Sequence, residues 1–202
     1  MLSPLQLEQT EEVAVLRLQS ADGTNRLTAA TVRALTEAIE SLARAPRPLL
    51  IAGNRQFFSV GADLTEIAAL DAASAYEFAG MGQSLMNAIA RFPVPVCAAI
   101  SGYCMGGGLD LALACRHRIA APGAVFGHRG AALGLVTGWG GTQRLPRLIG
   151  KARALEMFVT AEKVCGAEAA RIGLVDALDD HPEDSAIRWL RNFKETADSS
   201  PP

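Results

Sequence analysis

The chain has 202 residues, half of them hydrophobic, which is enough to bury one sizeable core. Its 19 basic and 21 acidic residues are well mixed, and the net charge of -2 excludes the basic stripe of a nucleic-acid binder and the polybasic patch of a membrane-surface protein. No run approaches the ~20 apolar residues of a membrane helix, and residues 1–12 lack a signal pattern, so we expect a cytoplasmic protein. The four cysteines show no metal-ligand spacing and are interpreted as reduced thiols.

Apolar strand-like runs alternate with helical patterns along the chain. The predicted elements, in order, are strand 13–18, turn 22–23, helix 29–45 with Thr28 as its N-cap, strand 48–53, helix 73–91, strand 94–100, helix 108–115, strand 117–121, helices within 145–160 and 166–172, strand 174–178 and a final amphipathic helix around 188–190. This alternation predicts an α/β protein with a parallel sheet. We expect one domain over residues 1–180, then a C-terminal helix and a disordered tail over 181–202.

Two loops of small residues follow predicted strands. Gly106, Gly107 and Gly108 stand at the start of a predicted helix, and residues 53–66, including Ala62, form the second loop. Carboxyl ends of neighbouring parallel strands share one edge, so the amides of Ala62 and Gly107 can point at one ligand oxygen. That oxygen belongs either to a phosphate or to a thioester carbonyl. The alternative is a pair of tight crossovers without a ligand.

Five stretches together resemble the crotonase superfamily, the enoyl-CoA hydratase and isomerase family. They are residues 25–28 (Asn-Arg-Leu-Thr), 58–64 (Phe-Ser-Val-Gly-Ala-Asp-Leu), 102–108 (Gly-Tyr-Cys-Met-Gly-Gly-Gly), 138–146 (Gly-Trp-Gly-Gly-Thr-Gln-Arg-Leu-Pro) and 169–175 (Ala-Ala-Arg-Ile-Gly-Leu-Val). The resemblance covers about residues 13–178. It implies a crotonase (ClpP-like) fold of repeated ββα units with a short C-terminal helical segment.

The resemblance also implies a function and a site. The ligand would be an acyl-CoA thioester, with coenzyme A as part of the substrate and no separate cofactor or metal, and the protein a homo-oligomer, either a trimer or a hexamer. Ala62 and Gly107 match the two amides that hold the thioester oxygen in this family. Further positions match the substrate-binding motifs, namely Arg26, Leu27, Gly61, Asp63, Leu64, Gly106, Gly130 and Trp139.

The chain departs from the hydratase pattern at the acid-base positions. Hydratases of the family typically carry two glutamates, and the matching positions here are Asp110 and Gly130. A glycine transfers no proton, so Asp110 and the nearby His128 are the candidate acid-base groups. Asp110 in the first turn of a helix is expected to be ionised by the helix dipole, and it either acts on the ligand or only stabilises the helix. His128 either replaces the missing glutamate or is a loop histidine bonded to the backbone.

Other residues have two interpretations each. Cys104 with His128 resembles the Ser-His arrangement of the related Clp peptidases, but no third, orienting acid is found. Asp63 is expected to cap a helix rather than perform chemistry. Trp139 occupies a position that is usually small in the family, and either narrows the acyl pocket or belongs to the core. Arg26 either meets the CoA phosphates or is solvated.

The sequence therefore predicts an acyl-CoA enzyme of the hydratase/isomerase type. A decarboxylase or thioesterase, which depends more on the oxyanion hole, is the alternative among enzymes. A catalytically weakened acyl-CoA-binding or scaffold protein is the alternative outside them. The family usually continues for several more helices, so we expect either a shortened member with an open or partner-completed site, or an oligomer assembled through the core.

Overall fold

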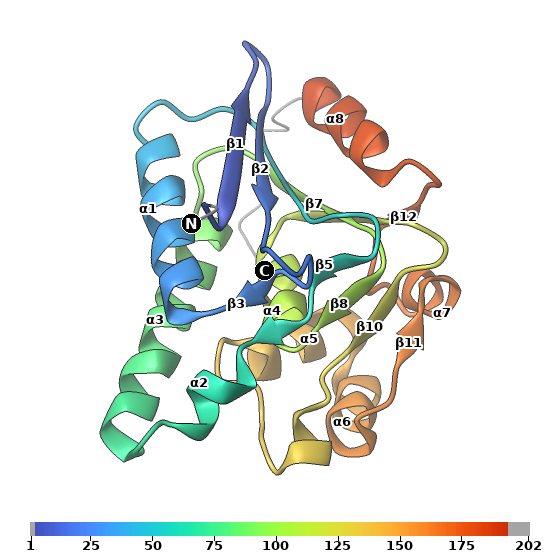
Figure 1. Ribbon diagram of the computed structural model, residues 1–202. Coiled ribbons are helices and arrows are strands. Elements are labelled where there is room, and N and C mark those ends of the chain that lie inside the picture. The colour runs from blue at the N-terminus through green and yellow to red at the C-terminus, as the bar shows by residue number, and fades with distance from the viewer. Residues whose placement is uncertain (1–2, 194–202) are drawn as a thin grey trace.

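A six-stranded sheet organises the computed structural model, which describes residues 3–193 (Figure 1). Its strand order is β1-β2-β4-β7-β9-β12, with β1 at Leu5–Gln9, β2 at Ala14–Leu18, β4 at Leu49–Ala52, β7 at Val96–Ile100, β9 at His117–Ala120 and β12 at Ala177–Leu178. Five strands are parallel, as the alternation predicts. The edge strand β1 pairs antiparallel with β2 and was not predicted, because four of its five residues are exposed and polar residues interrupt the apolar pattern.

A smaller sheet and a short ladder carry the loops that the sequence singled out. The smaller sheet has the order β11-β10-β8-β5, with β11 at Val164–Cys165, β10 at Val125–Gly127, β8 at Tyr103–Met105 and β5 at Phe57–Ser59. The ladder pairs β3 (Arg26–Leu27) with β6 (Gly61–Ala62) in parallel. The assignment of residues 53–66 to a loop was therefore wrong at β5 and β6, which are too short to show a period in sequence.

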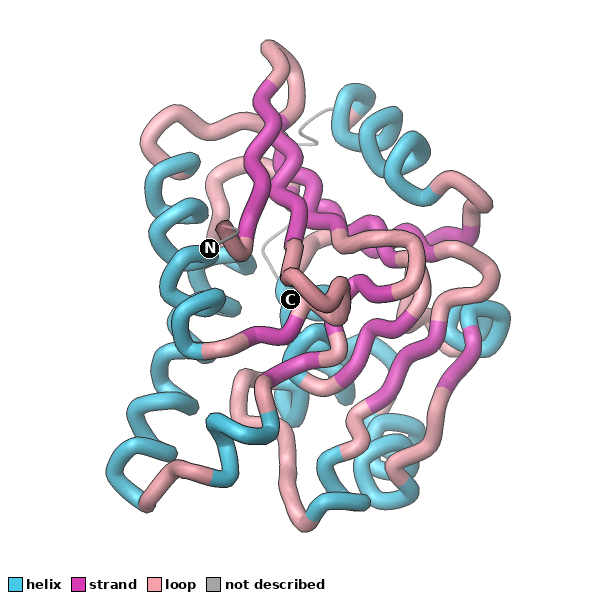
Figure 2. The backbone as a smooth tube through the Cα atoms, in the orientation of Figure 1, coloured by secondary structure: helices cyan, strands magenta, loops and turns pink. Residues whose placement is uncertain are grey.

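Helices cover the sheets on both sides (Figures 1 and 2). They are α1 at Ala29–Leu42, α2 at Leu64–Ala68, α3 at Ala72–Ala90, α4 at Gly107–Ala114, a 3-10 turn (η1) at Gly130–Leu133, α5 at Gly141–Ile149, α6 at Lys151–Thr160, α7 at Gly166–Arg171 and α8 at Pro182–Asn192. Thr28 caps α1 as predicted, because its side chain accepts from the Thr31 amide. The stretch 145–160 is split between two helices at Gly150, whose φ of 85° favours glycine.

The six-stranded sheet is buried on both faces, as the strand β4 shows. Leu49 and Ile51 belong to the large core under α1, α3 and α4, whereas Leu50 and Ala52 point the other way. There they meet the buried Ala186 and Leu190 of α8, so all four residues of β4 are buried. The helix in the predicted segment 181–202 is thus packed against the sheet, and the predicted disordered tail at 197–202 lies outside the described residues.

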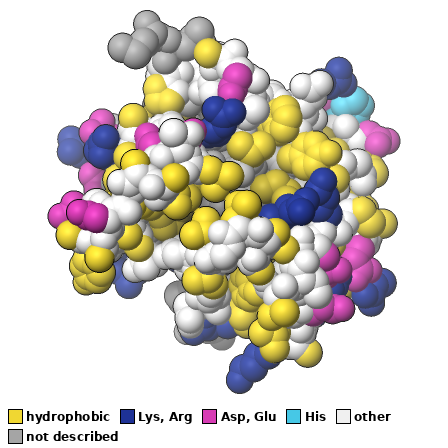
Figure 3. All heavy atoms as spheres, turned by 60° about the horizontal axis from the view of Figure 1, so that its bottom comes forward, with side chains coloured by type: hydrophobic (Ala, Val, Ile, Leu, Met, Phe, Trp, Pro, Cys, Tyr) yellow, Lys and Arg dark blue, Asp and Glu magenta, His cyan; other side chains and the backbone are white. Residues whose placement is uncertain are grey.

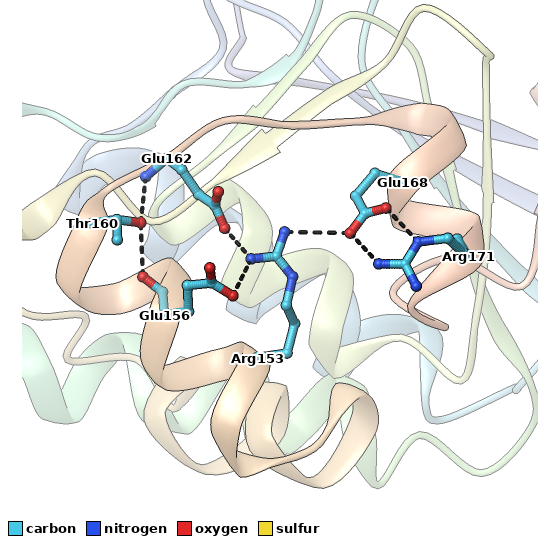
Figure 4. A network of polar contacts seen from close by, with 6 residues as sticks. All are labelled: Arg153, Glu156, Thr160, Glu162, Glu168 and Arg171. Atoms are coloured by element: carbon cyan, nitrogen blue, oxygen red, sulfur yellow. Dashed lines mark hydrogen bonds and ion pairs between the residues drawn. The ribbon is translucent and has the colours of Figure 1, made fainter.

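A network of charged side chains ties α6 to α7 (Figure 4). Arg153 of α6 contacts Glu156 at 2.8 Å and also pairs with Glu162. Its other nitrogen lies 3.4 Å from Glu168 of α7, which itself accepts two bonds from Arg171. The network holds together the two helices that support the edge of the smaller sheet.

Candidate active site

The two predicted oxyanion donors lie side by side. Ala62 ends β6, while Gly107 begins α4 directly after β8. A Cβ added to Gly61 would lie 2.9 Å from the amide nitrogen of Gly107, and one added to Gly107 would lie 3.5 Å from that of Ala62. The two small-residue loops therefore converge, as the shared sheet edge predicts, and bring the amide nitrogens of Ala62 and Gly107 close together.

Glycine is required on both sides of this amide pair. Gly61 has a φ of +91°, and a side chain there would come within 2.7 Å of the carbonyl of Met105. Gly106 has a φ of +51° as it turns the chain from β8 into α4. Gly107 is thus the first residue of an eight-residue helix, whose dipole adds positive potential at the amides.

Asp110 and His128, the two candidate acid-base groups, contact each other. Asp110 lies one turn into α4 and His128 follows β10, and their side chains are 1% and 4% exposed. Oδ1 of Asp110 is 3.4 Å from Nε2 of His128, and both atoms are buried without another hydrogen-bond partner. One proton placed between them, on either atom, would satisfy both. The sequence left these residues as alternatives, and the fold joins them into a pair.

Burial controls the charge of the pair. It raises the pKa of Asp110 to about 7, although bonds from Thr137 and the Gly141 amide and the charge of Arg144 oppose the rise. The helix dipole is expected to favour the ionised form of this carboxyl, but desolvation has the larger effect and raises the pKa. Burial also lowers the pKa of His128 to about 4, so the imidazole is neutral near pH 7, whereas Asp110 can gain or lose a proton there.

Two further residues touch Asp110 and were not singled out from the sequence. The hydroxyl of Thr137 donates to Oδ2 of Asp110, and Thr137 is half-buried, so it connects the carboxyl to the more exposed segment 131–138. A Cβ on Gly141 would overlap Oδ1 of Asp110 and come within 2.9 Å of Nε2 of His128. The sequence signal for both residues was their position, because Gly141 lies within the stretch 138–146 and Thr137 lies directly before it.

Gly130 lies in a turn that leaves no room for a side chain. It begins η1, and a Cβ there would lie 2.6 Å from the carbonyl oxygen of Leu135. That carbonyl belongs to a tight turn, since the amide of Leu135 donates to the carbonyl of Gly130 at 2.8 Å. A side chain at this position requires the turn to open.

The predicted residues of the substrate-binding motifs take different places. Asp63 caps α2, and the amides of Glu66 and Thr65 lower its pKa. Arg26 is about half exposed and pairs with Asp22 at 3.0 Å and with Asp63 at 3.8 Å. Beside them Leu27 is fully buried, and Leu64 of α2 is 54% exposed.

Apolar side chains also reach the surface around η1. Leu133 and Val136 are 56% and 71% exposed. The turn η1 and α2 lie at the bottom of Figure 1, and Figure 3, which brings that face forward, shows hydrophobic side chains gathered over it beside basic ones. Exposed apolar groups of this kind suit contact with a ligand or a partner.

The nucleophile alternative is not supported by the geometry. Cys104 is fully buried in β8, and its thiol points to the carbonyl of Gly108 at 3.5 Å. Burial raises the pKa of this thiol well above its usual value, which disfavours the thiolate that an attack would need. Within residues 3–193, no cluster of three or more metal-ligating side chains occurs, and no helix is long and apolar enough to cross a membrane.

The fold and the site define a class: a crotonase-fold protein with two converging backbone amides and a buried contact between Asp110 and His128, one turn further along α4. The chain belongs to the enoyl-CoA hydratase/isomerase family, whose model matches residues 8–201. Similar proteins include the crotonyl-CoA hydratase of Syntrophomonas wolfei, 39% identical over 84% of this chain and 66% of the relative. The mitochondrial methylglutaconyl-CoA hydratase of Mus musculus is 38% identical over 90% of this chain and 59% of the relative.

Solved structures agree with this assignment. Pseudomonas aeruginosa DspI superposes with a TM-score of 0.89 at 35% identity, over 93% of this chain and 78% of that one. The enoyl-CoA hydratase of Bacillus anthracis superposes with a TM-score of 0.88 at 32% identity, over 93% and 75% of the two chains. The chain spans between half and about two thirds of the length of the curated relatives it matches.

Proposed function

We propose that this chain is an acyl-CoA enzyme of the enoyl-CoA hydratase/isomerase type. The observation that carries the proposal is the placement of the Asp110–His128 pair one helical turn from the converging amides of Ala62 and Gly107. The amides would bind the thioester oxygen and stabilise the enolate that forms when charge moves onto it. Coenzyme A would enter as part of the substrate, without a separate cofactor.

A single acid-base pair is sufficient for hydration in this scheme. Ionised Asp110 accepts a proton from water as the water oxygen bonds to the β-carbon, and the electrons of the alkene move to the thioester oxygen. The Asp110 carboxyl then returns a proton to the α-carbon, so one water is added and the pair regains its starting state. The half-buried hydroxyl of Thr137 can pass the proton inward, because it already donates to Oδ2 of Asp110.

His128 supports this cycle by holding the other carboxyl oxygen. When Asp110 is ionised, an N–H on Nε2 of His128 can donate to Oδ1, and the proton that the carboxyl accepts can go to Oδ2, on the side of Thr137. Burial keeps His128 neutral near pH 7, so it can hold Oδ1 without a charge of its own. The same pair would serve isomerisation by taking a proton from one carbon and returning it to another.

One observation favours a second candidate, an acyl-CoA-binding protein without turnover. The resemblance to hydratases would place a catalytic glutamate at Gly130, and the turn at this glycine has no room for a side chain. Such a protein would keep the amides of Ala62 and Gly107 and bind thioesters without changing them.

Incubation with crotonyl-CoA separates the two candidates. Hydration removes the absorbance of the conjugated thioester, and we expect Asp110→Asn to slow that loss by about 10²-fold or more. We expect His128→Gln to have a smaller effect, since glutamine can still donate to Asp110. Binding of crotonyl-CoA by the wild type without loss of absorbance would reject hydration, and if 3-enoyl-CoA is not converted to the conjugated isomer either, the binding protein is left.

For assembly we propose a homo-oligomer, which sedimentation of the purified protein would test.

A further inference from the structure

The indole of Trp139 spans the gap between α3 and the start of α4. One edge faces Gly107, where an added Cβ would lie 2.5 Å from Cζ3, and the opposite edge faces Gly82 of α3, where a Cβ would overlap Nε1. The ring is 4% exposed, and Nε1 donates to the carbonyl of Phe78 at 3.2 Å. Two glycines thus leave room for one indole, and the indole fills it.

The indole and its neighbours are fixed to α3 by hydrogen bonds as well as by packing. Gln83 of α3 donates to the carbonyl of Gly138 at 2.8 Å, next to Trp139. Arg144 of α5 bonds to Asn87 of α3 at 2.9 Å and to the carbonyl of Trp139 at 3.3 Å. The indole is therefore held from both ends and cannot swing away without breaking several contacts.

The indole adjoins both parts of the candidate site, because it packs on Gly107 and its sequence neighbours Thr137 and Gly141 contact Asp110. Gly107 is one of the amides that would hold the thioester carbonyl, and the carbons beyond the carbonyl must approach Asp110 to exchange a proton. Thr137 and Gly141 flank Trp139 in sequence, and both lie against Asp110. The ring therefore stands beside the path from the amides to the acid-base pair.

We propose that Trp139 forms the end wall of the acyl pocket and restricts this chain to short acyl groups. The inference rests on the proposed function, which takes Gly107 as a carbonyl-binding amide and Asp110 as the group that the acyl carbons approach. A crotonyl or butyryl group would end at the indole, whereas octanoyl or dodecanoyl chains would need the space that the ring occupies. A hydrophobic pocket separates ligands of different length by about tenfold or more for each methylene that does not fit.

Binding of saturated acyl-CoAs tests the wall without any reaction. We expect the wild type to bind butyryl-CoA at least about tenfold more tightly than dodecanoyl-CoA in calorimetry, and Trp139→Ala to lose or reverse that preference. Trp139→Phe, which keeps an aromatic ring, should give an intermediate ratio. Trp189→Phe, on α8 away from the amides, is the matched control and should keep the wild-type ratio.

The outcomes distinguish the wall from the proposed reaction. Equal or tighter wild-type binding of dodecanoyl-CoA, or an unchanged ratio in a folded Trp139→Ala or Trp139→Phe protein, would overturn the wall even if crotonyl-CoA is hydrated. Preserved length selectivity without hydration or isomerisation would keep the wall and reject the enzyme. If Trp139→Ala does not fold, the wild-type and Trp139→Phe ratios decide. Absence of binding to every acyl-CoA would overturn both proposals.

Discussion

Replacement of Asp110 by asparagine separates the cost of burying a carboxylate from the chemistry that it performs. Burial raises the pKa of Asp110 from 3.8 to about 7, which corresponds to about 4 kcal/mol at about 1.4 kcal/mol per unit. The folded state holds this proton more tightly than the unfolded state, so wild-type stability contains a contribution that is full below pH 3.8 and is lost as pH rises toward 7. Asparagine keeps an acceptor for Thr137 and never ionises.

We therefore expect the stability difference between Asp110→Asn and the wild type to move in favour of the variant from pH 4 to pH 7, by up to about 4 kcal/mol. His128 contributes in the opposite direction. Its pKa is lowered to about 4 by burial, so its contribution is full above pH 6.5 and is lost as pH falls toward 4. The variant should retain this second dependence and become more stable as pH rises between about 4 and 6.5.

The assay is urea unfolding of both proteins over this pH range. Crotonyl-CoA hydration is measured on the same samples. The expected result is a variant at least as stable as the wild type near pH 7 and about 10²-fold or more slower in hydration. Parallel pH profiles of stability in the two proteins would refute the assignment of a desolvated carboxyl to Asp110. Full activity in the variant would refute its role in proton transfer.

Three other substitutions test the surroundings. Gly141→Ala places a Cβ against Asp110 and His128, so we expect about 1–3 kcal/mol of destabilisation in urea unfolding and about 10²-fold slower hydration, and an unaffected protein would contradict the packing. Thr137→Val removes a hydrogen bond that lowers the pKa of Asp110, so the pH profile of kcat/KM should move to higher pH. Thr137→Ser keeps the hydroxyl and should restore the wild-type profile. Identical profiles for the two variants would contradict a role of the hydroxyl in setting this pKa. Arg153→Met should cost at most about 1 kcal/mol in thermal or urea unfolding, less at high salt, and a larger loss that salt leaves unchanged would contradict a screened surface network.

The main sheet could be predicted from the sequence because its signals are local. Residues 48–53 form a continuous apolar run, and the structure buries all four residues of β4 within it. The hydroxyl of Thr28 caps α1 where a capping residue precedes the helical pattern. The strands β5, β6 and β8 were missed, because two or three residues fix no periodicity and depend on tertiary pairing.

The site was predictable where the backbone alone decides it. The small residues around Ala62 and Gly107 indicated amides that meet, and they do. The contact of Asp110 with His128 was not predictable, because it depends on how β10 lies beside α4 in space. The pKa of Asp110 depends on burial by residues from several elements, and the sequence showed only the local helix dipole, which acts in the opposite direction.

The pH dependence of crotonyl-CoA hydration tests the central claim most directly, that one buried carboxyl beside two backbone amides performs the reaction. Because the ionised form of Asp110 accepts the first proton, kcat/KM should rise with pH through about 7, the pKa to which burial moves this carboxyl. Crotonyl-CoA that binds to the protein and keeps its conjugated absorbance at every pH would contradict the claim.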